Sequence, residues 1–230
     1  MDPNGKIALV TGAGRRVGRT LALALGDAGC RVAVHYGQSE QDANETAALI
    51  QSMGSEAITV QADLEDPKQV ASLAESVREQ LGPIEILINN ASIFDKINLA
   101  ETSVDDWDRH LAINLRAPFL LAQAMQTQLA DDAHGKIISL NDWRTARPTR
   151  FAYGVSKTAL SGLTRTLALS MAPNVQANEI SLGAILPPSD IPVDRPHDEI
   201  KIDLGPADRM GSLNEVADAM MMLVKNDFIT

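Results

Sequence analysis

Short apolar runs alternate with longer stretches of helical periodicity along almost the whole chain. The runs predict strands at Ile7 to Val10, Arg31 to Tyr36, Ala57 to Gln61, Ile84 to Asn89, Lys136 to Leu140 and Val175 to Ile180. Helices are predicted over residues 17–28, 40–53, 67–81, 103–130, 151–172 and 213–225. The run Ile84-Glu85-Ile86-Leu87-Ile88 is too continuously apolar for a sheet with one wet face, which indicates strands covered by helices on both sides. We therefore expect an α/β fold: a doubly wound parallel sheet, Rossmann-like, in three αβα layers.

The 230 residues suit a single domain spanning 1–230. One stretch, 186–212, breaks the alternation because it is rich in proline, aspartate and other polar residues. We interpret it as a loop or lid over the site at the carboxyl ends of the strands. The alternative is a passive surface excursion.

Charge and cysteine content exclude several classes of function. The chain has 20 Lys and Arg against 30 Asp and Glu, a net charge of −10, so we expect no nucleic-acid or anionic-membrane partner. An anionic ligand must then meet a local basic cluster. A single cysteine, Cys30, excludes a disulfide framework and a multi-thiolate zinc site, and it suits a reducing compartment. With no signal-peptide pattern and no membrane-length apolar run, we expect a cytoplasmic protein.

The four histidines are too scattered along the sequence to predict a metal site, so no metal is expected. His110, within the predicted helix 103–130, is interpreted as a surface or helix-packing residue.

A glycine-rich turn follows the first strand directly, in the sequence Thr11-Gly12-Ala13-Gly14-Arg15-Arg16-Val17-Gly18. Glycines allow a tight turn and close approach of the backbone to a pyrophosphate, whose charge is favoured by the free N–H groups where the next helix begins. In this strand-turn-helix context we interpret the turn as a dinucleotide site rather than a purely structural turn. Its expected cofactor contacts are Gly12, Arg15, Arg16, Val17 and Gly18.

The end of the second strand predicts which dinucleotide binds. An acidic residue there would bond the ribose hydroxyls of NAD and repel the 2′-phosphate of NADP, but the strand ends His35-Tyr36-Gly37-Gln38-Ser39 with no acid before Glu40. His35, Tyr36 and Ser39, with the arginines of the turn, favour NADPH. The alternative is that His35 and Tyr36 simply end an edge of the sheet.

After the third strand, Asp63 could accept a hydrogen bond from the adenine amino group. Its competing role is to cap the next helix, for which Asp66, before Pro67, is the better candidate.

Several motifs together resemble the short-chain dehydrogenase/reductase family over nearly the whole chain. They are the turn from Thr11 to Gly18, Asn89-Asn90-Ala91, Asn114, and Tyr153-Gly154-Val155-Ser156-Lys157. Tyr153 and Lys157, at i and i+4, share a helix face, where an ammonium lowers the pKa of the phenol and makes it a proton donor near neutrality. The resemblance implies that Lys157 also holds the nicotinamide ribose and that Asn114 keeps a water in the proton path. Further cofactor contacts that it implies are Leu64, Asn90, Ala91, Ser92 and Gly183.

The chain departs from the family at the catalytic serine of the fifth strand. An ungapped alignment puts Asp142 there, whereas Ser139 comes too early and should point into the sheet. A carboxylate cannot donate to a developing oxyanion, so Asp142 suits a C=N substrate better than a ketone. The substitution resembles that of the pteridine reductases and the related dihydromonapterin reductases, which reduce dihydropterins or dihydrofolate with NADPH.

Further residues support this resemblance. Arg16 replaces the middle glycine of the turn, where it can reach both cofactor phosphate and pterin, and Ser92 and Phe94 match the segment whose aromatic ring covers one pterin face. The alternative for Phe94 is a core residue. Trp143 is expected either to line the same pocket or to pack on the surface. Two departures are a shorter spacing from Asp142 to Tyr153 and Leu182 where the family has proline before Gly183.

We therefore expect an NADPH-dependent enzyme that reduces a dihydropterin or dihydrofolate, with Asp142, Tyr153, Lys157 and Asn114 as catalytic residues. The alternatives are an NADPH-dependent carbonyl reductase, acting for instance on a 3-oxoacyl thioester, and a non-catalytic NADP(H)-binding regulator. The resemblance also implies a homotetramer, with contacts through the helices 103–130 and 151–172. The family continues into a seventh strand where this sequence stops at Thr230.

Overall fold

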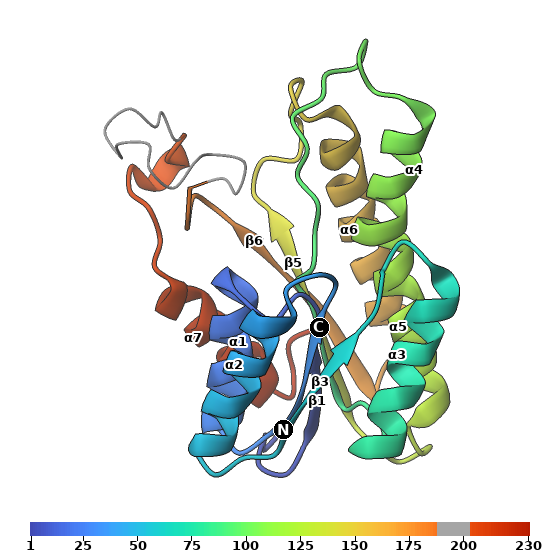
Figure 1. Ribbon diagram of the computed structural model, residues 1–230, viewed down its shortest axis with the longest axis vertical. Helices are drawn as coiled ribbons and strands as arrows, with labels where there is room; N and C mark the ends of the chain where they lie inside the picture. Colours follow the sequence, from blue (N-terminus) through green and yellow to red (C-terminus); the bar gives the residue numbers. More distant parts are fainter. Residues whose placement is uncertain (188–202) are drawn as a thin grey trace.

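A six-stranded parallel sheet runs through the centre of the computed structural model, which describes residues 1–187 and 203–230 (Figure 1). Its order is β3-β2-β1-β4-β5-β6. The strands are β1 (Ile7–Val10), β2 (Arg31–Tyr36), β3 (Ala57–Gln61), β4 (Ile86–Asn89), β5 (Gly135–Asp142) and β6 (Val175–Leu182). The predicted fold class and all six predicted strands are confirmed.

The helices connect these strands, as the alternation predicts. They are α1 (Arg16–Asp27), α2 (Glu40–Ser52), α3 (Pro67–Gln80), α4 (Val104–Leu111), α5 (Ala117–Gln128), α6 (Phe151–Ser170) and α7 (Leu213–Lys225). The single helix expected over 103–130 is instead two helices joined by a π-helical turn, Ala112–Arg116. Strands β5 and β6 are longer than predicted, because polar Asn141 and Asp142 continue the ladder opposite Ser181 and Leu182.

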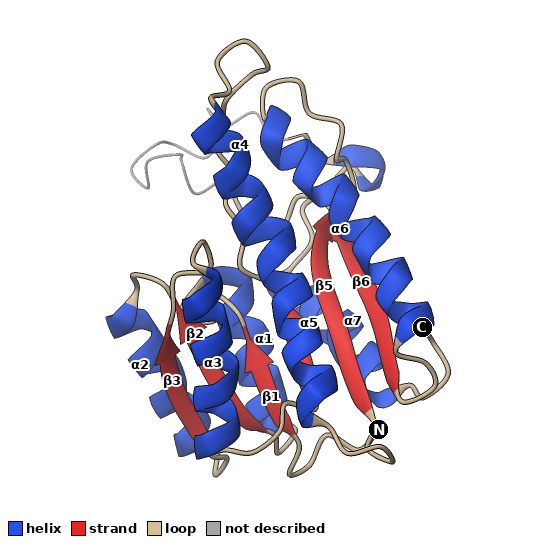
Figure 2. Ribbon diagram, turned by 90° about the vertical axis from the view of Figure 1, so that its right-hand side faces the viewer, coloured by secondary structure: helices blue, strands red, loops and turns tan. Residues whose placement is uncertain are grey.

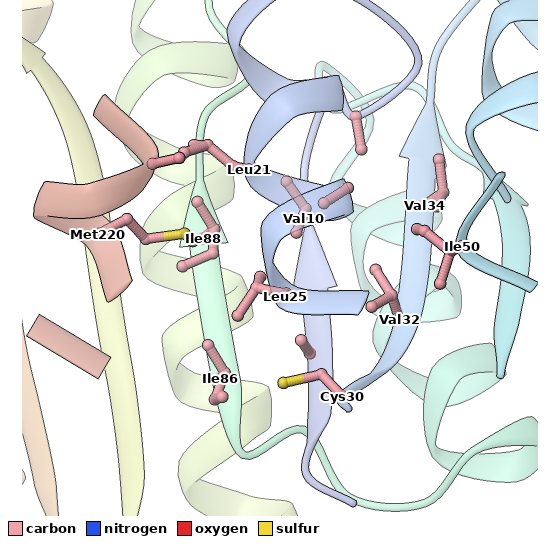
Figure 3. Packing of buried hydrophobic residues seen from close by; sticks show 14 of the residues in the cluster. Val10, Leu21, Leu25, Cys30, Val32, Val34, Ile50, Ile86, Ile88 and Met220 are labelled. Atoms are coloured by element: carbon pink, nitrogen blue, oxygen red, sulfur yellow. The ribbon is translucent and has the colours of Figure 1, made fainter. Parts of the chain in front are cut away.

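Helices cover both faces of the sheet, which explains the continuously apolar strands. Helices α1, α2 and α7 lie on one face, and α3, α5 and α6 lie on the other, with α4 beside α6 (Figures 1 and 2). Figure 3 shows the core beneath α1 and α7, where Val10, Ile86 and Ile88 of the sheet meet Leu21, Leu25 and Met220 of the helices. Residue alternation sends the neighbouring side chains, such as Leu9 and Leu87, into the second core.

Strand β1 pairs with both β2 and β4, so the strand order reverses there. In an open α/β sheet, ligands bind in the crevice beyond the carboxyl ends of the strands at such a switch point. The predicted lid 186–212 follows β6 toward this edge, but its residues 188–202 lie outside the described part of the chain. Among the described residues, no helix has the length and apolar character that crossing a bilayer requires.

Candidate active site

The glycine-rich turn between β1 and α1 has the geometry of an anion cradle. Gly12 has a φ of 63°, and a Cβ on Gly18 would lie 2.2 Å from the backbone oxygen of Gly12, so no larger residue fits at position 18. Helix α1 begins without a side-chain cap, and its first turn has no acidic residue. Its N-terminal N–H groups are therefore left for an anionic ligand.

Arg16 occupies a backbone conformation that favours glycine. Its φ is 55°, which matches its place where the family has the middle glycine of the turn. Nη2 of Arg16 donates to the backbone oxygen of Pro187 at 2.6 Å. Partial burial and the nearby charge of Arg15 lower the pKa of Arg16. The guanidinium therefore connects the turn to the start of the segment that follows β6.

His35 does not have the role predicted for it. The backbone N–H of Gly12 donates to its Nδ1 at 3.0 Å, so Nε2 carries the proton and donates to Ala62 O at 3.1 Å. The ring is 2% exposed, and burial lowers its pKa to about 4. A neutral imidazole with both nitrogens occupied cannot donate to a 2′-phosphate. His35 instead fixes the turn to the end of β3, a long-range contact with no signature in the sequence.

The other residues predicted on the cofactor side lie around the same edge. Asp66 accepts from Lys68 N at 2.8 Å, which confirms it as the cap of α3, and Oδ1 of Asp63 accepts from Glu65 N at 2.9 Å. The Asn90 amide donates to Thr11 O at 2.8 Å and so joins the end of β4 to the turn. The remaining residues of this group are Tyr36 and Leu64, both buried; Val17, Ser39 and Ala91, partly buried; Ser92, exposed; and Gly183, directly after β6.

Asn114 lies in the π-helical turn, a distortion that occurs often at functional sites. Its amide donates to Ile93 O at 3.2 Å and to Ser156 Oγ at 3.0 Å, and its oxygen accepts from Ser92 Oγ at 3.1 Å and Ile93 N at 3.0 Å. These four bonds satisfy the side chain completely. A water held at Asn114 would therefore have to bind its backbone, and the side chain itself fixes the segment before Phe94.

The structure brings Tyr153 and Asp142 together, as their predicted roles require. The Tyr153 hydroxyl donates to Oδ2 of Asp142 at 3.0 Å. The Arg147 guanidinium donates two hydrogen bonds to the same carboxylate, from Nε to Oδ2 at 3.0 Å and from Nη2 to Oδ1 at 2.9 Å. The backbone N–H of Arg144 donates to Oδ1 at 2.8 Å. A carboxylate offers about four lone-pair positions, so these four donors occupy all of them.

The predicted lowering of the Tyr153 pKa is wrong for this state of the site. Burial and the neighbouring Asp142 carboxylate, which accepts the phenolic proton, raise the pKa of Tyr153 well above its ordinary value. Lys157 is buried, and its Nζ donates to Leu140 O at 2.8 Å; burial lowers its pKa to about 8. Tyr153 is therefore a neutral acid at physiological pH. Burial is the larger cause, and the Asp142 carboxylate adds to it because it is in direct contact with the phenol.

Phe94 forms an aromatic wall beside Tyr153. The two rings meet edge to face, with centroids 4.5 Å apart and planes at 77°. The guanidinium of Arg150 lies 3.6 Å from the Phe94 centroid and also donates to the backbone oxygen of Phe94. Phe94 thus lies beside Tyr153 rather than in either core cluster. Trp143 is 39% exposed and packs on Gly205, where a Cβ would lie 3.0 Å from its ring.

Two arginines of the site, Arg147 and Arg150, were not predicted from the sequence. They lie in the loop between β5 and α6, where no periodicity indicates which side chains turn inward. The available signal was composition: Arg144, Arg147 and Arg150 recur every third residue, beginning two positions after Asp142. His110, expected on the surface or in helix packing, is buried at 1% exposure and packs within the fold.

Comparison with known proteins gives concordant results. Residues 6–197 match the family described as short chain dehydrogenase. A short-chain type dehydrogenase/reductase of Picea abies is 31% identical over 240 residues, covering 97% of this chain and 87% of that relative. The crystal structure of FolM Alternative dihydrofolate reductase 1 from Brucella canis complexed with NADP has a TM-score of 0.90 and 33% identity, covering 100% of this chain and 91% of that one. The angucycline C-6 ketoreductase LanV with bound NADP has a TM-score of 0.85 and 30% identity, covering 98% and 91%.

Proposed function

The chain belongs to the short-chain dehydrogenase family, and on that premise we propose that it is an NADPH-dependent reductase of a dihydropterin or dihydrofolate C=N bond. The observation that carries the proposal is the contact of the Tyr153 hydroxyl with the carboxylate of Asp142. A proton donor paired with an ionised acceptor fits a ring that both accepts and donates hydrogen bonds.

The turn after β1 supports NADPH as the cofactor. Its glycines leave room for a pyrophosphate at the uncapped start of α1, and Arg15 and Arg16 are the local basic cluster that a phosphorylated ribose requires. No acidic side chain follows β2 before Glu40 to repel a 2′-phosphate. The similar FolM and LanV structures contain NADP. When bound, NADPH supplies the hydride for the reaction.

The carboxylate of Asp142 argues for a nitrogen substrate. Reduction of a ketone places negative charge on oxygen, and the stabilising group must donate a hydrogen bond to it. The Tyr153 hydroxyl, the Arg147 guanidinium and the Arg144 backbone N–H all donate to the carboxylate itself. Reduction of a C=N bond instead requires delivery of a proton to nitrogen, and neighbouring ring N–H groups require an acceptor.

The hydrogen bonds already made to the Asp142 carboxylate determine how such a substrate could bind to it. Since its acceptor positions are filled, a substrate N–H can bond Asp142 only if one donor leaves. The donor free to leave is the Tyr153 hydroxyl, which rotates about its C–O bond, whereas Arg147 is held by two bonds. The hydroxyl would then turn to the substrate nitrogen and deliver its proton there. Lys157, through its ammonium, would stabilise the phenolate that remains.

Phe94 supplies an apolar wall for a flat heterocycle. The cation–π contact with Arg150 and the amide of Asn114, which holds Ile93, fix the segment that carries this ring. A pterin would stack against such a face, with Ser92, Trp143 and Arg16 at the margins of the pocket.

A substrate panel tests the proposal. We expect oxidation of NADPH with dihydropterins or dihydrofolate, faster than with NADH, and little turnover of simple ketones. Loss of absorbance at the nicotinamide band measures the rate with each substrate and each cofactor. Good turnover of ketones with none of any pterin or folate would overturn the proposal.

A carbonyl reductase is the second candidate, because the similar LanV structure is a ketoreductase and Arg147 offsets the charge of Asp142. Asp142→Ser separates the two functions. It should lower kcat/KM for a dihydropterin by about 100-fold and raise it for a ketone, since the serine hydroxyl can donate to an oxyanion. An NADP(H)-binding regulator would show neither activity, and turnover of any substrate excludes it. We also propose that the protein is cytoplasmic and forms a homotetramer. Analytical ultracentrifugation would test the tetramer.

A further inference from the structure

A polar network joins helix α6 to strands β5 and β6 below Lys157. The amide of Asn141 donates to Lys157 O at 3.1 Å, to Ser161 Oγ at 2.8 Å and to Glu179 Oε2 at 2.9 Å. Ser161 Oγ lies 3.0 Å from Oε1 and 2.8 Å from Oε2 of Glu179. Glu179 is half-buried in a strand covered by a helix, a position where an apolar residue is usual. A carboxylate here therefore needs an explanation.

Glu179 carries one of the two carboxylates that act on Lys157. Two carboxylates act on the Lys157 ammonium, Asp142 and Glu179, and both raise its pKa against the effect of burial. The guanidinium of Arg147 offsets Asp142 at 2.8 Å. The bonds described for Glu179 come from Asn141 and Ser161, which are neutral. Among the described residues, Glu179 thus has neutral hydrogen-bond partners, and Lys157 is the cation on which its charge acts.

We propose that Glu179 is a positioning residue of the active centre: with Asn141 and Ser161 it holds α6 against the sheet, and it places a negative charge in the network that reaches Lys157. A Lys157 that lost its proton could not stabilise the phenolate of Tyr153. Among the described residues, the titratable and charged groups around Lys157 are Tyr153 one turn earlier on α6, Asp142 on β5 with its partner Arg147, and Glu179 on β6.

The inference rests on the proposed role of Lys157 in the reductase, so its first test uses the protein without substrate or cofactor. Burial lowers the pKa of Lys157 from 10.5 to about 8 on folding. Below pH 8 the folded protein bears the full cost of the buried charge, and stability from this group rises as the pH passes from 8 to 10.5, because the unfolded chain then binds more protons. Unfolding by urea across this range measures the rise as the difference between the wild type and Lys157→Met, because burial also raises the pKa of Cys30 to about 12 and so lowers the stability of both proteins above pH 9.

Glu179→Gln keeps the shape and removes the charge. We expect the rise in stability to begin about half to one pH unit lower than in the wild type. In a Lys157→Met background, Glu179→Gln should no longer change the pH dependence. An unchanged pH dependence with a uniform loss of stability would show a purely structural role and overturn the proposal, whether or not a pterin is the substrate.

Activity supplies the second readout. With whichever substrate the panel identifies, the alkaline limb of the kcat profile should move to lower pH in Glu179→Gln by the same interval. Ser161→Ala, which removes a hydrogen bond and keeps the charge, should lower the melting temperature without moving the limb. Glu85→Gln is the matched control, because Glu85 is also half-buried and hydrogen-bonded but lies at the opposite end of the sheet. A shift of the limb in Glu85→Gln equal to that in Glu179→Gln would contradict the proposal.

Discussion

The two ends of the candidate site, the turn after β1 and the loop after β5, are formed by different kinds of group. At the turn after β1, the determining atoms are backbone: the carbonyl of Gly12, the free N–H groups of α1 and the positive φ of Arg16. At the loop after β5, they are charged and aromatic side chains: Asp142 against Arg147, and Phe94 against Arg150. Backbone shape is set locally, whereas charge pairs depend on residues that converge from several elements.

This difference indicates which end of the site can change when the substrate changes. A cradle of glycines and helix N–H groups binds phosphate whatever the substrate is, so it serves every reaction of the fold. In the proposed mechanism, the charged loop would define which group receives the proton. Mutations at the first end should therefore act on cofactor affinity, and mutations at the second on turnover and substrate choice. The following variants test that separation.

The largest effect is expected from Tyr153→Phe. It removes the proton donor and keeps the ring that packs against Phe94. General acid catalysis contributes about 10²–10⁴-fold, so kcat should fall by about 1,000-fold. The dissociation constant for NADPH, measured by fluorescence titration, should change by less than about twofold. A loss of NADPH affinity comparable to the loss of turnover would show that the two ends are not separable.

Gly18→Ala is the corresponding change at the cofactor end. Its Cβ would lie 2.2 Å from the Gly12 carbonyl, so the turn must open. We expect NADPH affinity to fall by about 100-fold, equivalent to about 3 kcal/mol, with some loss of thermal stability. Gly162→Ala is the control, because a Cβ there meets nothing within 4 Å, and in helix α6 it should stabilise the protein by up to about 1 kcal/mol. Normal NADPH binding by Gly18→Ala would mean that the turn is not the phosphate site.

Sequence alone predicted the fold and the local part of the site. The strands from β1 to β3 match their predicted ranges, because apolar runs bounded by turn residues leave few alternatives. The turn from Gly12 to Gly18 and the i, i+4 pair of Tyr153 and Lys157 are also local patterns. The π-helical turn at Asn114 was missed, because a helix of continuous periodicity does not reveal one widened turn.

Long-range contacts explain the remaining errors. His35 lies next to the end of β2, as expected, but its ring bonds to Gly12 and Ala62, which are distant in sequence. The direction of the Tyr153 pKa shift was predicted wrongly because burial and the Asp142 carboxylate across the site raise this pKa, and the i, i+4 spacing to Lys157 reveals neither of them. Such pairings are decided by packing, and single-sequence patterns do not contain them.

Arg147→Met tests the charged loop directly. It leaves the Asp142 carboxylate without its forked partner, so the acceptor loses its fixed orientation. We expect kcat/KM for a dihydropterin to fall by about 30-fold, or about 2 kcal/mol, with NADPH affinity unchanged. Arg144→Met is the matched control, because the bond from Arg144 to Asp142 comes from the backbone and survives the substitution. Equal losses in the two variants would indicate a general effect of removing positive charge.

Arg16 belongs to the cofactor end and contacts the segment after β6, and it gives the smallest and most discriminating effect. Both Arg16→Gly and Arg16→Ala remove the guanidinium, so each should reduce the preference for NADPH over NADH by about tenfold. Only glycine adopts a φ of 55° without steric cost, so Arg16→Gly should be more stable than Arg16→Ala by about 1 kcal/mol in urea unfolding. Alanine and glycine therefore separate the charge of Arg16 from its backbone conformation. If the two variants were equally stable, the left-handed conformation would not constrain this position; if cofactor preference were unchanged in both, the 2′-phosphate would have to bind elsewhere.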